Sequence, residues 1–360
     1  MQNLIKRAGI DPVIIDDVIW GCNYQRTYKE NNLARVAAVK AGLPVTVPGI
    51  TIHRNCTSSM SAIQMGFYQI RAGEAECIMA GGSDSMSTAP HMVFNARYGQ
   101  KYGHMEMRDS MWDSLTNLGV GPAMGITAEN VADKYDITRE QMDAYSLRSQ
   151  QRAVAAIDAG RFEEEIVPVT VKSRKSETVY TVDEYPKRNA TLEGLQKLKP
   201  AFKEGGKVTA GNASGMNDAS SGVILMSEEK AKELGCPIMA KVVSVATTGV
   251  EPELMGIGPI SSTKKALEKA GLTVDDIDLF EINEAFSSQC LACQKELGVP
   301  DEKLNVNGGG ISLGHPVGAT GSRIVITLMY ELKRRKQRYG VATLCAGGGM
   351  GTTVVIEMCE

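Results

Sequence analysis

The sequence predicts an α/β protein built from two copies of one unit, with a long insertion between the copies. Two internal matches carry this prediction. "AGIDPVIIDDVIWG" at 8–21 matches "AGLTVDDIDLFEIN" at 270–283, and "ECIMAGGSDSMS" at 76–87 resembles "VATLCAGGGMGTT" at 341–353. In the first pair a helix ends at glycine, an acidic turn follows, and an apolar strand comes next. Such self-similarity indicates a duplicated fold.

The matches also set the domain boundaries. The first copy takes 1–86 and continues at about 213–236, the insertion takes 87–212, and the second copy takes 237–360. The second copy places a β-branched strand at 238–249 before its helix, and the first copy has no counterpart. We therefore expect the first half to lack this N-terminal strand.

The insertion differs in texture from the two copies. It holds a Met- and Gly-rich segment, then an amphipathic helix that Thr138 opens as N-cap, with Gln141 at the capping-box position. Charged and β-rich stretches follow. A long insertion between the halves of a symmetric core is a natural place for a substrate lid or channel.

Composition bounds the function. The 360 residues are 43% hydrophobic and 22% charged, with a net charge of −3, so nothing favours a nucleic acid or membrane partner. The chain has no apolar run of the ~20 residues that span a bilayer, and its first residues are not typical of a signal peptide. The eight cysteines are irregularly spaced, which predicts a reduced, cytoplasmic protein. Cys290 and Cys293 form a lone C-x-x-C pair, which favours core packing over a metal site.

Two reactive residues occupy equivalent places in the copies. Cys56 in "NCTSSMSA" and His315 in "GHPVG" lie at closely matching distances after Gly9 and Gly271. Pseudo-symmetry then brings them together, and a Cys–His pair is the minimal device for nucleophilic acyl chemistry. We expect the imidazole and a helix N-terminus to raise the thiolate fraction of Cys56, and the hydroxyl residues after it to cap that helix.

Further groups fall at the ends of predicted strands. The glycines after Cys345 offer backbone N–H donors suited to an oxyanion hole, and Asn283 could orient a water or polarise a carbonyl. Neither GGG segment completes the G-x-G-x-x-G pattern of dinucleotide-binding proteins.

In combination these segments resemble the thiolase family over essentially the whole chain. The matching segments, in order, are "MGITAENVADKY", "TAGNASGMNDASS", "MGIGPI", "INEAF", "NGGGISLGHPVGATGSR" and "CAGGGMGTT". The resemblance implies a five-layered αβαβα core of two pseudo-symmetric halves with an inserted loop domain that binds CoA. It also implies CoA and acyl-CoA as substrates, no separate cofactor or metal, and a homodimer or homotetramer.

The resemblance assigns roles to single residues. Cys56 matches the acyl-accepting nucleophile, His315 the base that activates it, and Cys345 the group that moves the substrate's α-proton. Asn283, through a water, and His315 would form one oxyanion hole, and the N–H groups of Cys56 and Gly347 the other. Ser214 matches a residue at the pantetheine arm. The walls of the acyl and pantetheine channel match Met124, Phe202, Met255 and Phe286.

The implied activity is ping-pong transfer of an acyl group between Cys56 and CoA, by Claisen condensation or thiolytic cleavage of a 3-ketoacyl-CoA. An acetyl-CoA C-acetyltransferase is the first expectation. His53, Thr57 and Ala123 depart from the usual pattern, and Ala123 stands where acetoacetyl-CoA-type enzymes often carry histidine. A longer-chain degradative thiolase therefore stays open, as does a catalytically silent acyl-CoA- or lipid-binding relative. A ketoacyl synthase of the same fold is disfavoured, because "NEAF" and the second cysteine occur together.

Overall fold

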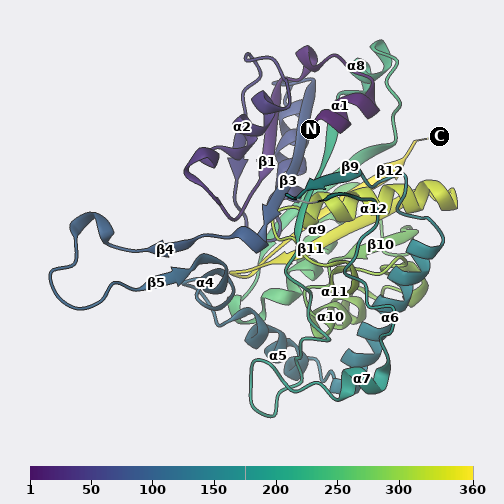
Figure 1. Ribbon diagram of the computed structural model, residues 1–360. Helices are drawn as coiled ribbons and strands as arrows, with labels where there is room; N and C mark the ends of the chain where they lie inside the picture. Colours follow the sequence, from purple (N-terminus) through teal and green to yellow (C-terminus); the bar gives the residue numbers. More distant parts are fainter. Residues whose placement is uncertain (175, 360) are drawn as a thin grey trace.

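The computed structural model describes residues 1–174 and 176–359 (Figure 1). Two four-stranded mixed sheets form the centre of this described part. The first sheet has the order β2-β1-β3-β8, and the second has the order β10-β11-β12-β9. The strands of the first are β1 (Asp17–Gly21), β2 (Ile50–Ile52), β3 (Cys77–Ser85) and β8 (Asp218–Met226). Those of the second are β9 (Ala240–Gly249), β10 (Leu279–Ile282), β11 (Tyr339–Ala346) and β12 (Met350–Met358).

The sheets repeat one topology, as the internal matches predict. β1 pairs in parallel with β3, and β10 pairs in parallel with β11. An antiparallel strand follows in each sheet, β8 beside β3 and β12 beside β11. β9 then pairs with β12, whereas the described strands of the first sheet end at β8. The expectation that the first half lacks a counterpart of β9 is confirmed for the described residues.

Helices complete five layers. α3 (Ser58–Arg71) and α12 (Thr320–Arg335) lie between the sheets and share one apolar core with the inner faces of both. α1 (Gln2–Ala8) and α2 (Leu33–Lys40) cover the outer face of the first sheet, and α9 (Gly258–Ala270) and α10 (Ser287–Leu297) that of the second. The faces follow the period of two in a strand, since Ile19 packs inward while Val18 and Trp20 pack outward. The αβαβα expectation is confirmed.

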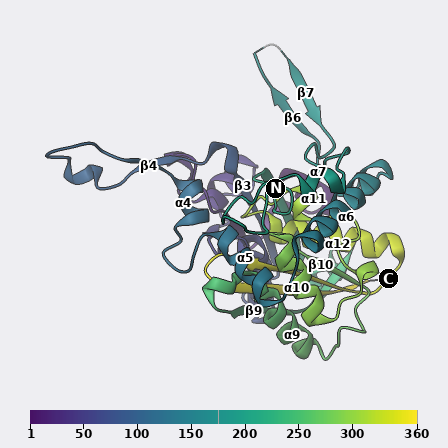
Figure 2. The same cartoon turned by 90° about the horizontal axis from the view of Figure 1, so that it is seen from below.

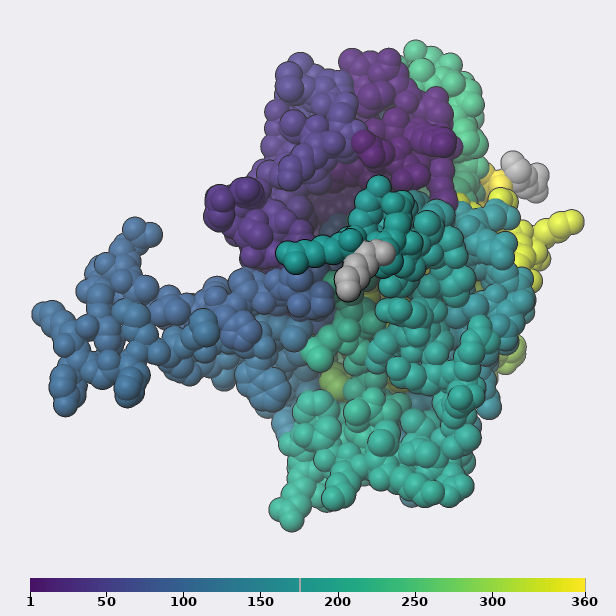
Figure 3. All heavy atoms as spheres, in the orientation of Figure 1, coloured from purple at the N-terminus to yellow at the C-terminus, as the bar shows by residue number. Residues whose placement is uncertain are grey.

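The inserted segment packs partly on the second half and partly projects from it. Its elements are β4 (His91–Val93), β5 (Met107–Asp109), α4 (Ser110–Thr116), α5 (Met124–Lys134), α6 (Arg139–Asp158), β6 (Val169–Lys172), β7 (Glu177–Tyr180) and α7 (Leu192–Gln196). α5 and α6 pack against α10, and the capping box of Thr138 and Gln141 is present at the start of α6. The β4–β5 arm stands clear of the body (Figure 3), and the β6–β7 hairpin projects separately (Figure 2).

Short elements complete the description. α8 spans Glu228–Glu233 and α11 spans Gly310–Leu313. Short 3-10 segments occur at Pro12–Ile14, Tyr28–Glu30, Met86–Thr88, Ala96–Tyr98, Pro252–Ile257 and Asp301–Lys303. None of the helices in the described part has the length and apolar character needed to cross a bilayer.

One strand continues further than its sequence indicates. The double glycine after "CIMA" reads as the end of a strand, but β3 runs through Gly81 and Gly82 to Ser85. A Cβ at Gly81 would lie 2.3 Å from the Ser221 carbonyl oxygen, and one at Gly82 would lie 2.0 Å from that of Gly318. Gly81 therefore lets β8 pair closely with β3, and Gly82 lets the second half approach the first sheet, so neither glycine ends the strand.

Candidate active site

Cys56 lies in a tight turn that leads into α3. The amide N–H groups of Thr57 and Ser58 donate to the carbonyls of Arg54 and Asn55, at 3.1 and 3.0 Å. Asn55 adopts the left-handed region, with φ of +46°. Asparagine tolerates this conformation better than most residues with a side chain. The turn sets the cysteine immediately before the first turn of a helix.

The hydroxyl residues after Cys56 do not cap that helix, so this part of the prediction is wrong. The Thr57 and Ser58 hydroxyls donate instead to the Arg54 and Asn55 carbonyls, which holds the turn itself. Their small size has a packing reason. A Cβ at Gly21 would lie 2.7 Å from the Ser58 Cβ, and Ser59 Oγ accepts from the Ser322 amide of α12. The start of α3 is thus pressed against β1 and α12.

The Cys56 thiol is protonated at rest. Burial raises its pKa to about 11, while hydrogen bonds from the Gly347 and Cys56 N–H groups act in the opposite direction. The expectation that the thiolate fraction is already raised is therefore wrong, because loss of hydration outweighs the local dipoles. The two N–H groups nevertheless lie where the sequence places an oxyanion hole. A base has to remove the proton as Sγ reacts.

His315 is held as that base would need to be. Its Nδ1 lies 2.7 Å from Thr320 Oγ1, and the Thr320 hydroxyl donates its single proton to the Pro316 carbonyl. Thr320 Oγ1 therefore accepts from Nδ1–H, which leaves Nε2 as an acceptor. Among the described residues Nε2 has no hydrogen-bond partner although it is buried. Burial, and then the charge of Arg323, lower the His315 pKa to about 4, so the ring is neutral.

Asn283 and Cys345 come from neighbouring strands of the second sheet. The Asn283 amide nitrogen lies 3.5 Å from His315 Nδ1, and its Oδ1 is buried with no hydrogen-bond partner among the described residues. Cys345 is fully buried near the end of β11. Burial raises the pKa of its thiol well above the usual range, and nearby Cys56 and Cys293 raise it further. Both thiols are thus neutral at rest.

The predicted channel residues gather beside Cys345. Met255 and Phe286 share an apolar cluster with Cys345, and Met124 packs against it. Phe202 meets Phe286 edge to face at 6.3 Å between ring centroids. Ser214 joins the same region, because its amide donates to the Ala285 carbonyl at 3.0 Å.

Asp84 links the nucleophile segment to the histidine loop, and sequence reasoning missed it. One carboxylate oxygen accepts from the Gly318 amide at 2.6 Å and from Asn23 Nδ2 at 3.0 Å. The same Asn23 nitrogen lies 3.3 Å from the Asn55 carbonyl. Cys56 itself packs with Val317. The only sequence signal was an acid among small residues in "GGSDSMS".

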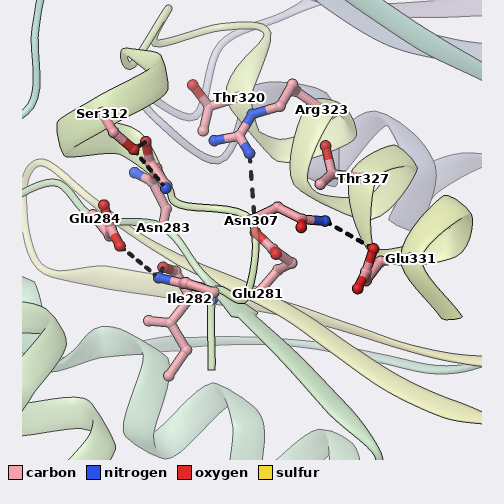
Figure 4. A network of polar contacts seen from close by, with 12 residues as sticks. Glu281, Ile282, Asn283, Glu284, Asn307, Ser312, Thr320, Arg323, Thr327 and Glu331 are labelled. Carbon is pink, nitrogen blue, oxygen red and sulfur yellow. Dashed lines mark hydrogen bonds and ion pairs between the residues drawn. The ribbon is translucent and has the colours of Figure 1, made fainter. Parts of the chain in front are cut away.

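A buried carboxylate, Glu284, supports Asn283 from behind (Figure 4). Glu284 accepts from the Tyr145 and Ser149 hydroxyls at 3.0 and 2.6 Å and from the Ile311 amide at 3.2 Å. These bonds tie β10 to α6 and α11, so they fix the strand end that carries Asn283. Thr320 and Glu284 could not be recognised as support from spacing alone, because their partners are set by the fold.

A second polar group lies between β10 and α12. Burial raises the pKa of Glu281 to about 8, and Arg323, 3.9 Å away, only partly offsets it (Figure 4). Asn307 in the same region donates to Glu331 at 3.0 Å. Within residues 1–174 and 176–359, no group of three or more His, Cys, Asp or Glu side chains could hold a metal ion. Cys290 and Cys293 are both fully buried on α10, as the packing interpretation predicts.

Comparisons with known proteins agree with this architecture. The thiolase N-terminal domain model matches residues 1–229, and the thiolase C-terminal domain model matches residues 236–358. An acetyl-CoA acetyltransferase of Syntrophomonas wolfei is 51% identical, over 99% of this chain and 91% of that protein. The Bacillus anthracis acetyl-CoA acetyltransferase structure has a TM-score of 0.96 at 48% identity, covering 99% of this chain and 91% of that one.

A human structure widens the comparison. The human mitochondrial 3-ketoacyl-CoA thiolase has a TM-score of 0.97 at 43% identity, covering 100% of this chain and 91% of that one. The two family models and the solved structures therefore indicate the same fold for this chain. With its duplicated halves and its cysteine and histidine segments in matching places, this chain belongs to the thiolase family.

Proposed function

We propose that this chain is a thiolase that transfers an acyl group between Cys56 and CoA, and that acetyl-CoA and acetoacetyl-CoA are its substrates. The observation that carries the proposal is the state of His315. Thr320 Oγ1 accepts a hydrogen bond from Nδ1–H, the ring is neutral, and Nε2 is buried without a partner among the described residues. This is the form in which an imidazole can accept a proton from a thiol.

Thiolysis follows from these parts. His315 Nε2 takes the Cys56 proton while Sγ bonds to the 3-keto carbon, whose oxygen becomes an oxyanion. The bond between C2 and C3 then breaks, and Cys345 protonates the leaving enolate to give acetyl-CoA, while the shortened acyl group stays on Cys56. The CoA thiol next attacks the acylated Cys56 and displaces Sγ. The proton that His315 took from Cys56 returns to the Cys345 thiolate, and the CoA proton passes through His315 to the departing Sγ. This releases the shortened acyl-CoA and restores the resting state.

The oxyanions need separate partners. The N–H groups of Cys56 and Gly347 face Sγ, so they are suited to the acyl oxygen on that sulfur. Asn283 lies beside the imidazole, and together they would bind the second, enolate oxygen. Hydrogen bonds that strengthen as negative charge develops lower the barrier of each step.

Substrate length rests on the channel and on the relatives. Proteins that share 45–51% identity with this chain carry the name acetyl-CoA acetyltransferase, and a related human 3-ketoacyl-CoA thiolase has been solved with CoA. For CoA phosphates the inserted segment offers six basic residues between 187 and 207. They are Lys187, Arg188, Lys197, Lys199, Lys203 and Lys207. Ala123, in place of a larger imidazole, favours longer acyl chains as the second candidate.

A chain-length series tests the function. The protein is incubated with CoA and 3-ketoacyl-CoA substrates from four to sixteen carbons, and loss of the 3-keto thioester is followed. We expect the highest kcat/KM for acetoacetyl-CoA, and a Cys56→Ala variant without turnover. A maximum at long chains would favour the degradative enzyme. Binding of acyl-CoA with no turnover at any length would instead indicate a silent binding protein.

We also infer that the protein forms a homodimer or homotetramer and works in the cytoplasm. The β4–β5 arm carries exposed apolar side chains, which suits burial against another copy. They include Met92, Val93, Phe94, Tyr98 and Met107. All eight cysteines are free, which fits a reducing compartment. Light scattering after size exclusion tests the assembly, and a monomer at micromolar concentration would contradict it.

A further inference from the structure

Asn55 crosses from the first half to the second beside the nucleophile. Its Nδ2 donates to the Gly347 carbonyl oxygen at 2.8 Å, although 292 positions separate the two residues. Its Oδ1 lies 3.0 Å from His53 Nε2. The side chain therefore connects the turn before Cys56 to the glycine turn after Cys345.

The position of Asn55 is fixed from its own backbone. Its carbonyl accepts from the Ser58 amide at 3.0 Å, the Ser58 hydroxyl at 2.7 Å and Asn23 Nδ2 at 3.3 Å. The left-handed φ of +46° turns its side chain out of the helix that follows. These backbone contacts hold the Asn55 side-chain amide in one position.

Gly347 has no such constraint from its own backbone, because two further glycines follow it. It opens the turn between β11 and β12, and the next two residues, Gly348 and Gly349, have φ of +87° and +85°. Three consecutive glycines have little intrinsic preference for one conformation. Yet the Gly347 N–H faces Cys56 Sγ, where its direction matters. A Cβ at Gly347 would lie 2.6 Å from a terminal methyl group of Leu118, so a larger residue here would require the Leu118 side chain to move.

We propose that Asn55 is a positioning residue that holds Gly347, and with it the N–H donor aimed at Cys56 Sγ, and that His53 orients the Asn55 amide. The inference rests on the proposed function for its catalytic consequence. Its structural part concerns the reactivity of the thiol and stands without turnover. His53 is exposed, and we call its contact with Asn55 Oδ1 the outer anchor.

Two substitutions at Asn55 separate the amide from the backbone. Asn55→Gly keeps the left-handed conformation and removes the amide, whereas Asn55→Asp keeps the shape and sets a carboxylate against the Gly347 carbonyl. Lys336→Gly is the control, because Lys336 also has a left-handed φ, of +56°, but is exposed at the end of α12. His53→Ala removes the outer anchor without disturbing a buried group.

The first measurement is the rate of Cys56 alkylation by iodoacetamide against pH, read by mass spectrometry of the peptide that contains Cys56. We expect both Asn55 variants to shift this profile toward higher pH, because the N–H donor no longer faces the sulfur. His53→Ala should shift it in the same direction by less, and Lys336→Gly should leave it unchanged. Because no thiolase turnover is needed, this test survives a failure of the proposed function.

The second measurement is thiolysis of acetoacetyl-CoA. A misdirected oxyanion donor should lower kcat of Asn55→Asp on the order of tenfold to a hundredfold, with KM for CoA changed far less. Alkylation profiles that match the parent in both Asn55 variants would overturn the proposal, whatever the turnover. If an Asn55 variant does not fold, the His53→Ala profile decides: a shift supports the proposal, and an unchanged profile overturns it.

Discussion

The two halves share one topology but differ in how deeply their strands are buried. Six residues of β12 are buried, whereas β8, its equivalent in the first half, has none. The first half supplies one reactive side chain, Cys56, and the second supplies the imidazole, the second thiol and Asn283. The groups that need a dehydrated setting therefore come mainly from the more deeply buried copy, where hydrogen bonds to developing charge are stronger.

The largest effect should come from separating the two halves chemically. Cys56→Ala and His315→Ala should each lower kcat for thiolysis by about ten-thousand-fold or more, since nucleophile and base act as one unit. The double variant should be no slower than the slower single variant. Steady-state thiolysis rates of the three proteins check this. Additive losses would show that the residues from the two halves act independently.

A smaller effect isolates the thiol that belongs to the second half alone. Cys345→Ser should lower turnover by about a hundredfold to ten-thousand-fold, the range typical of a lost general acid or base. Transfer of an acetyl group from acetyl-CoA to Cys56 should persist, because Cys345 acts only at the α-carbon. Intact-protein mass spectrometry detects this acetylation. Loss of both steps would place Cys345 in the first half-reaction as well.

The contact between the two halves at Gly82 and Gly318 can be tested by adding a methyl group to Gly82. Gly82→Ala would place a Cβ 2.0 Å from the Gly318 carbonyl oxygen, a backbone atom of the other half that cannot swing aside. We expect a loss of about 1–3 kcal/mol in the free energy of unfolding, as for other overpacked sites. Gly194→Ala, in the exposed helix α7, is the control and should be neutral or stabilising. Equal denaturation midpoints for Gly82→Ala and the parent would show that the backbone near Gly318 moves to accommodate the methyl group.

The last test uses a position where only one of the matched copies has an ionisable side chain. In the gap-free match Glu281 stands where the first half has Ile19. Burial raises the Glu281 pKa to about 8, above the 4.5 of a free carboxyl. Between these values the unfolded chain binds fewer protons than the native one, so this group's contribution falls as pH rises, by up to about 1.4 kcal/mol per pH unit.

Glu281→Gln should therefore lose less stability than the parent between pH 5 and pH 8. The two proteins should be close in stability at pH 5 and furthest apart at pH 9, where the parent must ionise a buried acid. Chemical denaturation at both pH values measures the difference, and other carboxyls cancel in the comparison. A difference that is the same at pH 5 and pH 9 would show that Glu281 does not titrate there.

Most of the architecture could be predicted from sequence because the duplication is written in local patterns. Gly9 and Gly271 both end helices in the left-handed conformation, and Thr138 with Gln141 forms the capping box expected of it. These signals involve neighbours in the chain, so propensity and period suffice. The resemblance likewise assigned site roles to single residues such as Cys56, His315 and Cys345, and these roles stay predictions.

What could not be predicted depends on contacts between distant segments. The hydroxyls after Cys56 face a neighbouring helix and their own turn, which no local rule of capping includes. Gly82 reads as a strand end until Gly318 is known to lie against it. The Cys56 pKa is set by burial, which a sequence does not state, and Asn55 meets Gly347 only in the folded chain.

The meeting of α3 and α12 has an electrostatic consequence. Ser59 and Ser322 join the first turns of these helices, and a Cβ at Gly321 would lie 2.5 Å from the Met60 amide nitrogen, so both helices begin at the same place. A helix N-terminus carries about half an elementary positive charge, so the two together place about one elementary positive charge near the pseudo-twofold axis. An enolate forming there meets a field that is already oriented. Duplication of one unit therefore supplied this charge without a charged side chain.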